Sequence, residues 1–257
     1  MNIRKNQLKE NLRKGKKQYG IWNGLVDSYA AEICAGAGFD WICIDGEHAP
    51  FELCTILHNM QAIQSHEVSA MVRIPSVDTA LIKQLLDMGA QTILVPMIES
   101  ADQAALVASA MVYPPEGMRG VGTALARAAQ WSRVKDYYVA ANEQMCCIGQ
   151  IESVKGVDAL DEILKVEGLD VCFIGPADLA ATMGYLGQSG HPEVVSLVKD
   201  CIAKIRKAGK VAGFLTASKK LIAEYSEAGA LMIGVGLDTL MLAEATRNLA
   251  ENYKKEL

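Results

Sequence analysis

The segment Ala35–Asp45, AGAGFDWICID, contains the unit from which the fold of this chain is built. Its glycines end a helix-forming stretch, where a left-handed residue can stop the helix, and a short apolar run follows at once. The same arrangement recurs at DMGAQT (87–92), KAGKVA (207–212) and EAGALM (227–232). Helices that stop at glycine and lead directly into buried strands are typical of repeated parallel βα units.

Eight apolar or β-branched runs have the length and composition of buried strands. They are YGIWNGL (19–25), FDWICID (39–45), VSAMVRIP (68–75), QTILVPM (91–97), CCIGQIE (146–152), DVCFIGP (170–176), KVAGFLT (210–216) and ALMIGVG (230–236). Most of the segments between them have helical periodicity, and the clearest are 29–36, 51–62, 79–88, 101–112, 194–208 and 219–228. Eight such units close most economically as an α/β (β/α)8 TIM barrel, with an open doubly wound sheet as the alternative.

The length of 257 residues suits a single barrel domain over 1–257, because barrels of this kind commonly need about 250 residues. No low-complexity linker or internal repeat divides the chain. The stretch between the fourth and fifth strands, about 113–142, is too long for a plain connection. We therefore expect an insertion there with its own helix, acting as a lid or as an oligomer contact.

Charge and composition exclude several classes of partner. The net charge is -5 and the calculated pI is near 5.5, which argues against nucleic acid. No apolar run has the length of a membrane span, and the basic N-terminal stretch lacks the apolar core of a signal peptide, so we expect a cytoplasmic protein without a membrane partner. The seven cysteines form no CxxC pair and are interpreted as reduced core residues.

Polar residues follow the second and third strands, at the end of the barrel where active sites lie. Asp45 and His48 belong to DGEH, and the imidazole of His48 suits proton transfer near neutral pH, with Asp45 placed to hold its tautomer. An exposed histidine in a turn is the alternative. Arg73 ends an apolar strand and needs an anionic partner there. That partner is either a substrate carboxylate or enolate oxygen, or a structural salt bridge to Asp45 or Asp87.

A second group of polar residues follows the fifth and sixth strands. Gln150 and Glu152 point to the same side of their strand, which is the barrel mouth if Ile151 packs outward. Glu152 and Asp178 could then share a hard divalent cation, Mg2+ or Mn2+ with Co2+ tolerated. The backbone of 175–178, GPAD, could hold a substrate carboxylate, Gly175 included. A surface ion pair for Glu152 and a simple helix cap for GPAD are the alternatives.

Other motifs limit the possible chemistry. RGVG (119–122) lacks the third glycine and the strand–helix context of a dinucleotide site. Arg119 and Arg127, in the same insertion, are instead hypothesised to bind the far carboxylate of a dicarboxylic substrate. A class I aldolase would need a lysine at a strand end for a Schiff base, but Lys219 and Lys220 come later, in the next helix. A non-catalytic metabolite-binding barrel would not need both His48 and Arg73.

Several motifs together resemble those of the HpcH/HpaI class II pyruvate aldolases, almost from end to end. They are AGAGFDWICIDGEHAP (35–50), VRIP (72–75), IKQLLDMGAQTILVPM (82–97), YPPEGMRGVGTALARAAQWSR (113–133), QIES (150–153), FIGPADLAATMGY (173–185) and GVGLDT (234–239). The order of DGEHAP and IGPADL is specific. CCIGQIE (146–152) and GFLTAS (213–218) depart from the family pattern at the pocket wall, so the resemblance leaves the aldehyde preference open.

The resemblance implies a pyruvate-binding (β/α)8 barrel that uses a divalent metal ion to cleave a 4-hydroxy-2-oxo acid into pyruvate and an aldehyde. It also implies a homohexamer with one helix exchanged between subunits. The positions that match functional residues of the family are His48 as base, Asp87 as the acid that raises its basicity, Arg73 as transition-state stabiliser, Glu152 and Asp178 as metal ligands, and Gln150 and Ala177 as substrate-binding residues. Sugar-acid aldolases and a citrate-forming synthase on the same scaffold remain alternatives.

Overall fold

All eight predicted strands form, and they close into one ring. The computed structural model describes residues 2–254, in which neighbouring strands pair in parallel and β8 returns to pair with β1. The strands are β1 (Gln18–Asn23), β2 (Trp41–Asp45), β3 (Ser69–Arg73), β4 (Thr92–Val95), β5 (Cys146–Ile151), β6 (Leu169–Ile174), β7 (Val211–Leu215) and β8 (Met232–Leu237). The predicted (β/α)8 barrel is confirmed, and the open doubly wound sheet is excluded.

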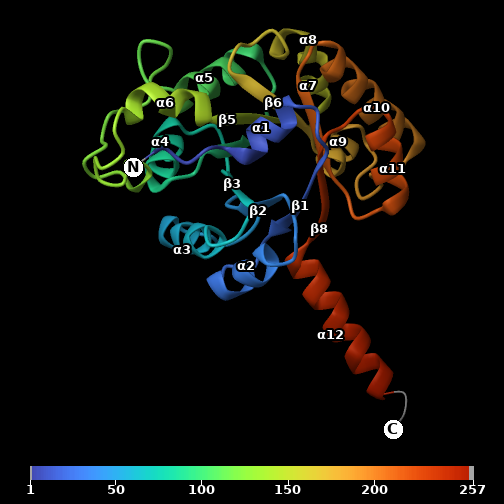
Figure 1. The fold of residues 1–257 in the computed structure, drawn as a ribbon. Coiled ribbons are helices and arrows are strands. Elements are labelled where there is room, and N and C mark those ends of the chain that lie inside the picture. Colours follow the sequence, from blue (N-terminus) through green and yellow to red (C-terminus); the bar gives the residue numbers. More distant parts are fainter. Residues whose placement is uncertain (1, 255–257) are drawn as a thin grey trace.

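Helices follow the strands around the outside of the ring (Figure 1). They are α2 (Ser28–Ala35), α3 (Leu53–Ile63), α4 (Thr79–Met88), α5 (Ala101–Met111), α7 (Val154–Asp158), α8 (Leu160–Ile163), α9 (Pro176–Thr182), α10 (Pro192–Lys207) and α11 (Lys219–Glu227). Predicted glycine stops are confirmed by left-handed backbone angles, since Gly89 after α4 has φ +109° and Gly229 after α11 has φ +113°. Each stop turns the chain directly into the next strand.

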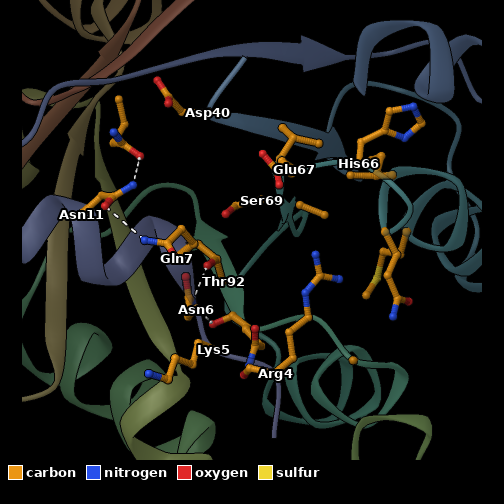
Figure 2. A pocket seen from close by; sticks show the side chains of 18 of the residues that line it. Arg4, Lys5, Asn6, Gln7, Asn11, Asp40, His66, Glu67, Ser69 and Thr92 are labelled. Atoms are coloured by element: carbon orange, nitrogen blue, oxygen red, sulfur yellow. Dashed lines mark hydrogen bonds between the residues drawn. The ribbon is translucent and has the colours of Figure 1, made fainter. Parts of the chain in front are cut away.

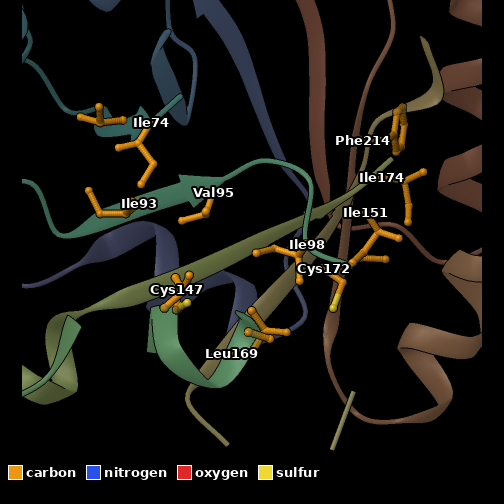
Figure 3. Close-up of a cluster of buried hydrophobic side chains, with 14 of the residues drawn as sticks. Ile74, Ile93, Val95, Ile98, Cys147, Ile151, Leu169, Cys172, Ile174 and Phe214 are labelled. Carbon is orange, nitrogen blue, oxygen red and sulfur yellow. The ribbon is translucent and has the colours of Figure 1, made fainter. Parts of the chain in front are cut away.

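The barrel has two apolar layers, one outside the strands and one within the ring. Outward side chains such as Ile93 on β4 and Ile151 on β5 pack against the helices (Figure 3). Inside the ring, Trp22, Trp41 and Phe173 form an aromatic layer, with ring centroids 5.6 Å and 5.4 Å from Trp22. Helix α1 (Gln7–Arg13) closes the N-terminal end of this inner layer through its buried leucines.

The insertion forms its own small core at the N-terminal end of the strands. It runs from the end of α5 to the start of β5 and contains a 3-10 turn at Arg127–Ala129 and α6 (Tyr137–Gln144). Tyr113 and Tyr137 anchor an apolar cluster of their own there. The segment cannot be a lid over the mouth of its own barrel, because it lies at the opposite end.

The C-terminal helix α12 (Asp238–Lys254) extends away from the barrel (Figure 1). Asp238 at its start is buried, whereas the apolar side chains along it are exposed, among them Leu240, Met241, Leu249 and Tyr253. An amphipathic helix is normally stabilised by packing of its apolar side, and this chain supplies little to pack against. Within residues 2–254, no helix is long and apolar enough to cross a membrane.

The aromatic layer makes one glycine of β1 indispensable. A Cβ on Gly20 would lie 2.0 Å from the indole of Trp41, which is fully buried and cannot move aside. We expect Gly20→Ala to lower the free energy of unfolding by about 3 kcal/mol or more through overpacking. Urea denaturation would measure this. Gly190→Ala is the matched control, because no neighbouring atom lies within 4 Å of its added Cβ; equal stability of the two variants would contradict the packing argument.

Candidate active site

A buried ion pair joins the ends of β2 and β3 at the barrel mouth. Asp45 and Arg73 are register partners, and the guanidinium donates from Nε to Oδ1 at 2.9 Å and from Nη2 to Oδ2 at 2.7 Å. Burial opposes ionisation of Asp45, but its hydrogen bonds and attraction to Arg73 outweigh burial and lower its pKa. The predicted salt bridge of Arg73 is therefore made to Asp45.

The turn after β2 brings Glu47 back toward the same guanidinium. Gly46 donates its N–H to the carbonyl of Arg73 at 2.8 Å, and a Cβ at this position would lie 2.7 Å from that oxygen, so only glycine fits. Glu47 Oε2 consequently lies 2.9 Å from Nη1 of Arg73. Sequence reasoning missed Glu47, although its place in DGEH beside two chosen residues was a usable signal.

His48 stands at the edge of this network with a largely exposed side chain. Its backbone N–H donates to Asp45 Oδ1 at 3.3 Å, but its imidazole Nε2 lies 3.8 Å from Glu47 Oε2. The expected contact in which Asp45 holds the tautomer of the imidazole is not made, because both oxygens of Asp45 are engaged by Arg73. The carboxylate beside the ring is that of Glu47.

The predicted orientation of the end of β5 is confirmed. Ile151 packs into the outer core, and Gln150 and Glu152 point inward, where the Gln150 amide donates to Glu152 Oε2. Glu152 Oε1 accepts the backbone N–H of Met97 at 2.9 Å. Burial, together with the nearby charge of Asp178, raises the pKa of Glu152 to about 7. Ionisation of this buried carboxyl group is therefore disfavoured unless a cation lies beside it.

Gly175 and the start of α9 complete this side of the mouth. A Cβ on Gly175 would lie 2.5 Å from Glu152 Oε2, so glycine is needed for the carboxyl group to fit. Ala177 and Asp178 lie in the first turn of α9, with Asp178 exposed. Close packing against Glu152 thus explains why position 175 is a glycine.

The donor set fits a hard divalent cation. Glu152 and Asp178 supply carboxylate oxygens, and Gln150 Oε1 is buried without a hydrogen-bond partner. A cation would oppose the two largest causes of the raised pKa of Glu152, which are burial and, to a lesser extent, repulsion by Asp178. Over residues 2–254, no group of three or more His, Cys, Asp or Glu side chains is arranged to hold a metal ion. An ion here would therefore need oxygens from substrate or water as well.

Asp87 and Arg119 lie at the opposite end of the barrel. Asp87 is in the last turn of α4, just before β4, and its carboxylate accepts a hydrogen bond from Nη2 of Arg119 at 2.9 Å. Arg119 is fully buried and stacks on Tyr113, with its guanidinium carbon 4.4 Å from the ring centroid. The hypothesis that Arg119 binds a substrate carboxylate in this mouth is wrong, because its role is structural.

Arg127 lies away from the mouth too, and the candidate lysines lie on helices rather than on strands. Arg127 donates from Nη1 to the carbonyl of Met88 at 2.9 Å, near the start of β4, so it cannot bind a substrate in its own mouth either. Lys219 and Lys220 are exposed at the start of α11. Lys9 is buried, but it lies in α1 at the N-terminal end and pairs with Asp170 at 3.1 Å. None of these lysines is placed to form a Schiff base at the mouth.

A cavity of about 510 Å³ lies at the N-terminal end of the barrel (Figure 2). Its lining includes Arg4, Lys5, His66 and Glu67, but none of the carboxylates at the mouth. The charged network that carries chemistry and this cavity are therefore separate features. We assign the active site by the network, since buried charge is costly and persists where it has a function or a partner.

A closed parallel barrel with ionisable groups gathered at the C-terminal ends of its strands defines a barrel enzyme. The chain belongs to the HpcH/HpaI aldolase/citrate lyase family, whose model matches residues 18–245. Membership makes it a carbon–carbon lyase. The predicted family resemblance is confirmed.

Individual relatives agree with this assignment. The chain is 50% identical over 254 residues to a hydroxypyruvate/pyruvate aldolase from Pseudomonas aeruginosa, covering 99% of this chain and 95% of the relative. It is 50% identical over 248 residues to a 4-hydroxy-2-oxo-heptane-1,7-dioate aldolase from Escherichia coli, covering 96% and 95%. A solved HpcH/HpaI family structure from Burkholderia cenocepacia J2315 has a TM-score of 0.92 at 37% identity, covering 97% of this chain and 99% of that one.

The raised pKa of Glu152 leads to a prediction for the metal-free protein. The folded state favours the neutral carboxyl group, so its contribution to stability is complete below the ordinary glutamate pKa and is lost as pH rises through about 7. We expect metal-free wild type to lose roughly 2 kcal/mol more stability than Glu152→Gln between pH 4.5 and pH 8. Urea denaturation in EDTA would measure it. Parallel pH curves for the two proteins would contradict the assignment.

Proposed function

We propose that this chain is a metal-dependent class II aldolase that cleaves 4-hydroxy-2-oxo acids into pyruvate and an aldehyde through the pyruvate enolate. The substrate proposed is 4-hydroxy-2-oxoheptane-1,7-dioate, with succinic semialdehyde as the second product, as in the catabolism of aromatic compounds. One observation carries the proposal: the Arg73 guanidinium, held by Asp45, lies at the same mouth as the carboxylates Glu152 and Asp178.

The residues of the mouth have separate proposed roles. Glu152 and Asp178 would hold a divalent cation, proposed as Mg2+, Mn2+ or Co2+, which when bound supplies Lewis-acid polarisation of the 2-oxo acid. Gln150, Gly175 and the backbone of Ala177 would orient the pyruvate part of the substrate. Arg73 remains cationic in its carboxylate cradle and stabilises the negative charge that develops on the enolate oxygen.

His48 is the group proposed to move the proton. Cleavage removes the proton of the 4-hydroxyl group, the bond between C3 and C4 breaks, and its electron pair becomes the enolate of pyruvate. The enolate then takes a proton at C3, so that cleavage yields pyruvate and an aldehyde with no covalent enzyme intermediate. The exposed position of the imidazole at the mouth leaves room for an intervening water in this transfer.

The two curated relatives differ in the substrates that their names carry, hydroxypyruvate with pyruvate in one and the seven-carbon dioate in the other. Aldol cleavage of a 4-hydroxy-2-oxo acid releases a pyruvate enolate whatever the aldehyde, which is why the proposal rests on that step. A sugar-acid aldolase uses the same step. A citrate-forming synthase remains a candidate because the family description includes citrate lyase.

We also propose a cytoplasmic homohexamer in which α12 packs against a neighbouring copy. The exposed apolar side chains of α12 support exchange of this helix, because they lack a covering surface in their own chain. Asp87, which lies at the far end from His48, could reach an imidazole only in a second copy. No nucleic acid or membrane partner is proposed.

Exchange of the pyruvate methyl hydrogens in heavy water tests the enolate step without the correct aldehyde. We expect the EDTA-treated protein to be inactive and Mg2+, Mn2+ or Co2+ to restore exchange, measured by proton NMR of pyruvate.

His48→Ala should lower aldol cleavage by about 100-fold or more while pyruvate still binds. Glu152→Ala should abolish metal and pyruvate binding together. Exchange that persists without metal, or a fully active His48→Ala, would contradict the mechanism.

The assembly is tested on α12 itself. Light scattering on a sizing column should give the wild type a mass several times the 27.7 kDa of one chain. Leu242→Glu with Leu249→Glu, two exposed apolar positions seven residues apart, should produce smaller species because charge is placed on one side of the helix. Arg247→Ala, a polar change on the same helix, is the control. A monomeric wild type would contradict the proposed hexamer.

A further inference from the structure

We infer that Glu47 is a positioning residue that holds the guanidinium of Arg73 and the imidazole of His48 in a fixed position relative to each other. The inference deepens the proposed function and rests on it, since those two groups act on substrate there. The turn after β2 would then carry two carboxylates with different tasks: Asp45 holds the guanidinium of Arg73 and the backbone of the turn, and Glu47 couples the side chains of Arg73 and His48.

The contacts of Arg73 show this division. Asp45 takes Nε and Nη2, at 2.9 Å and 2.7 Å, while Glu47 Oε2 lies 2.9 Å from the remaining nitrogen, Nη1. Carboxylates on two edges of a planar guanidinium oppose its rotation in the plane. From below, the ring of Trp22 lies 5.6 Å from the guanidinium carbon and limits tilting. Glu47 therefore adds an ionic contact, without an aligned hydrogen bond, at the third nitrogen of Arg73.

The contacts of His48 single out Glu47 rather than Asp45. The oxygens of Asp45 already accept from Arg73 and from the backbone N–H groups of Glu47 and His48. Glu47 Oε2, by contrast, is buried and has no aligned hydrogen-bond donor, although it is the atom 3.8 Å from the imidazole Nε2. Its lone pair is therefore available to an imidazole N–H or to a water between the two groups.

The charges around Glu47 favour the same position. Burial raises its pKa, while Arg73 on β3 and His48 on its own turn attract the carboxylate. Asp45 on the same turn and Asp178 on α9 repel it, as does Glu152 at the end of β5. Repulsion therefore drives the Glu47 carboxylate away from the other carboxylates of the mouth. Attraction draws it toward Arg73 and His48, the two groups that Glu47 would align.

Chemical modification of His48 tests the coupling independently of catalysis. Diethyl pyrocarbonate attacks neutral imidazole, so the pH dependence of His48 modification, followed by peptide mass spectrometry on the Mg2+-loaded protein, reports its protonation. Loss of a carboxylate 3.8 Å away should move the midpoint for Glu47→Gln to lower pH, by about 0.3 to 1 unit. Glu47→Asp should move it less. Glu167→Gln, an exposed glutamate at the other end of the barrel, should leave it unchanged.

Kinetics of pyruvate exchange test the effect on chemistry. A positioning role predicts that Glu47→Gln lowers kcat for exchange by about 10- to 100-fold, while KM for pyruvate stays within about 3-fold. Glu47→Asp should recover part of kcat, and Glu167→Gln should match the wild type. A large rise in KM with loss of metal would make Glu47 a ligand instead and overturn the inference.

The outcomes separate the inference from the function on which it rests. An unchanged modification midpoint together with unchanged kcat in Glu47→Gln overturns the inference, and so does a shifted midpoint with unchanged kcat. A wild type that exchanges no pyruvate hydrogen with any metal overturns the proposed function. In that case the modification midpoint alone decides whether Glu47 faces His48, and its failure to move rejects that contact as well.

Discussion

The pairing of β8 with β1 is the constraint on which the rest of the structure depends, because it closes the ring of parallel strands. Closure places all eight C-terminal strand ends around one opening, so residues more than a hundred positions apart meet there. Asp45 on β2 and Glu152 after β5 belong to the same mouth for this reason alone. The aromatic layer of Trp22, Trp41 and Phe173 fills the interior of the ring beneath this opening with closely packed side chains.

Electrostatics then decides what the mouth can do. One buried guanidinium, that of Arg73, is compensated by Asp45, while the carboxyl group of Glu152 lies nearby with its pKa raised by burial and by Asp178. The proposed binding of an anionic oxo acid together with a metal ion rests on this arrangement, with an oriented cation on one side of the mouth and a buried acid on the other. The neighbouring glycines, Gly46 and Gly175, allow the backbone to approach closely enough for this arrangement.

The accuracy of the predictions for the site follows the range of the interactions involved. Gln150 and Glu152 were placed correctly because the two-residue repeat of a strand is local. Arg73 was correctly given an anionic partner, but choosing between Asp45 and Asp87 required the strand register. Arg119 was misjudged because its partners, Asp87 and Tyr137, come from elements distant in sequence. Glu47 was missed because only the folded turn shows that its side chain bends back.

The sequence by itself determined the barrel, its eight strands and the strand ends that carry polar groups, because glycine stops and apolar runs act over a few residues. Only the tertiary structure decided which charges pair across the mouth and which end of the barrel holds the insertion. It also showed that the apolar side chains of α12 are not covered by their own chain. Those facts depend on closure of the ring and on the direction of each connection. No local pattern encodes them, since they arise when separate segments are brought into contact.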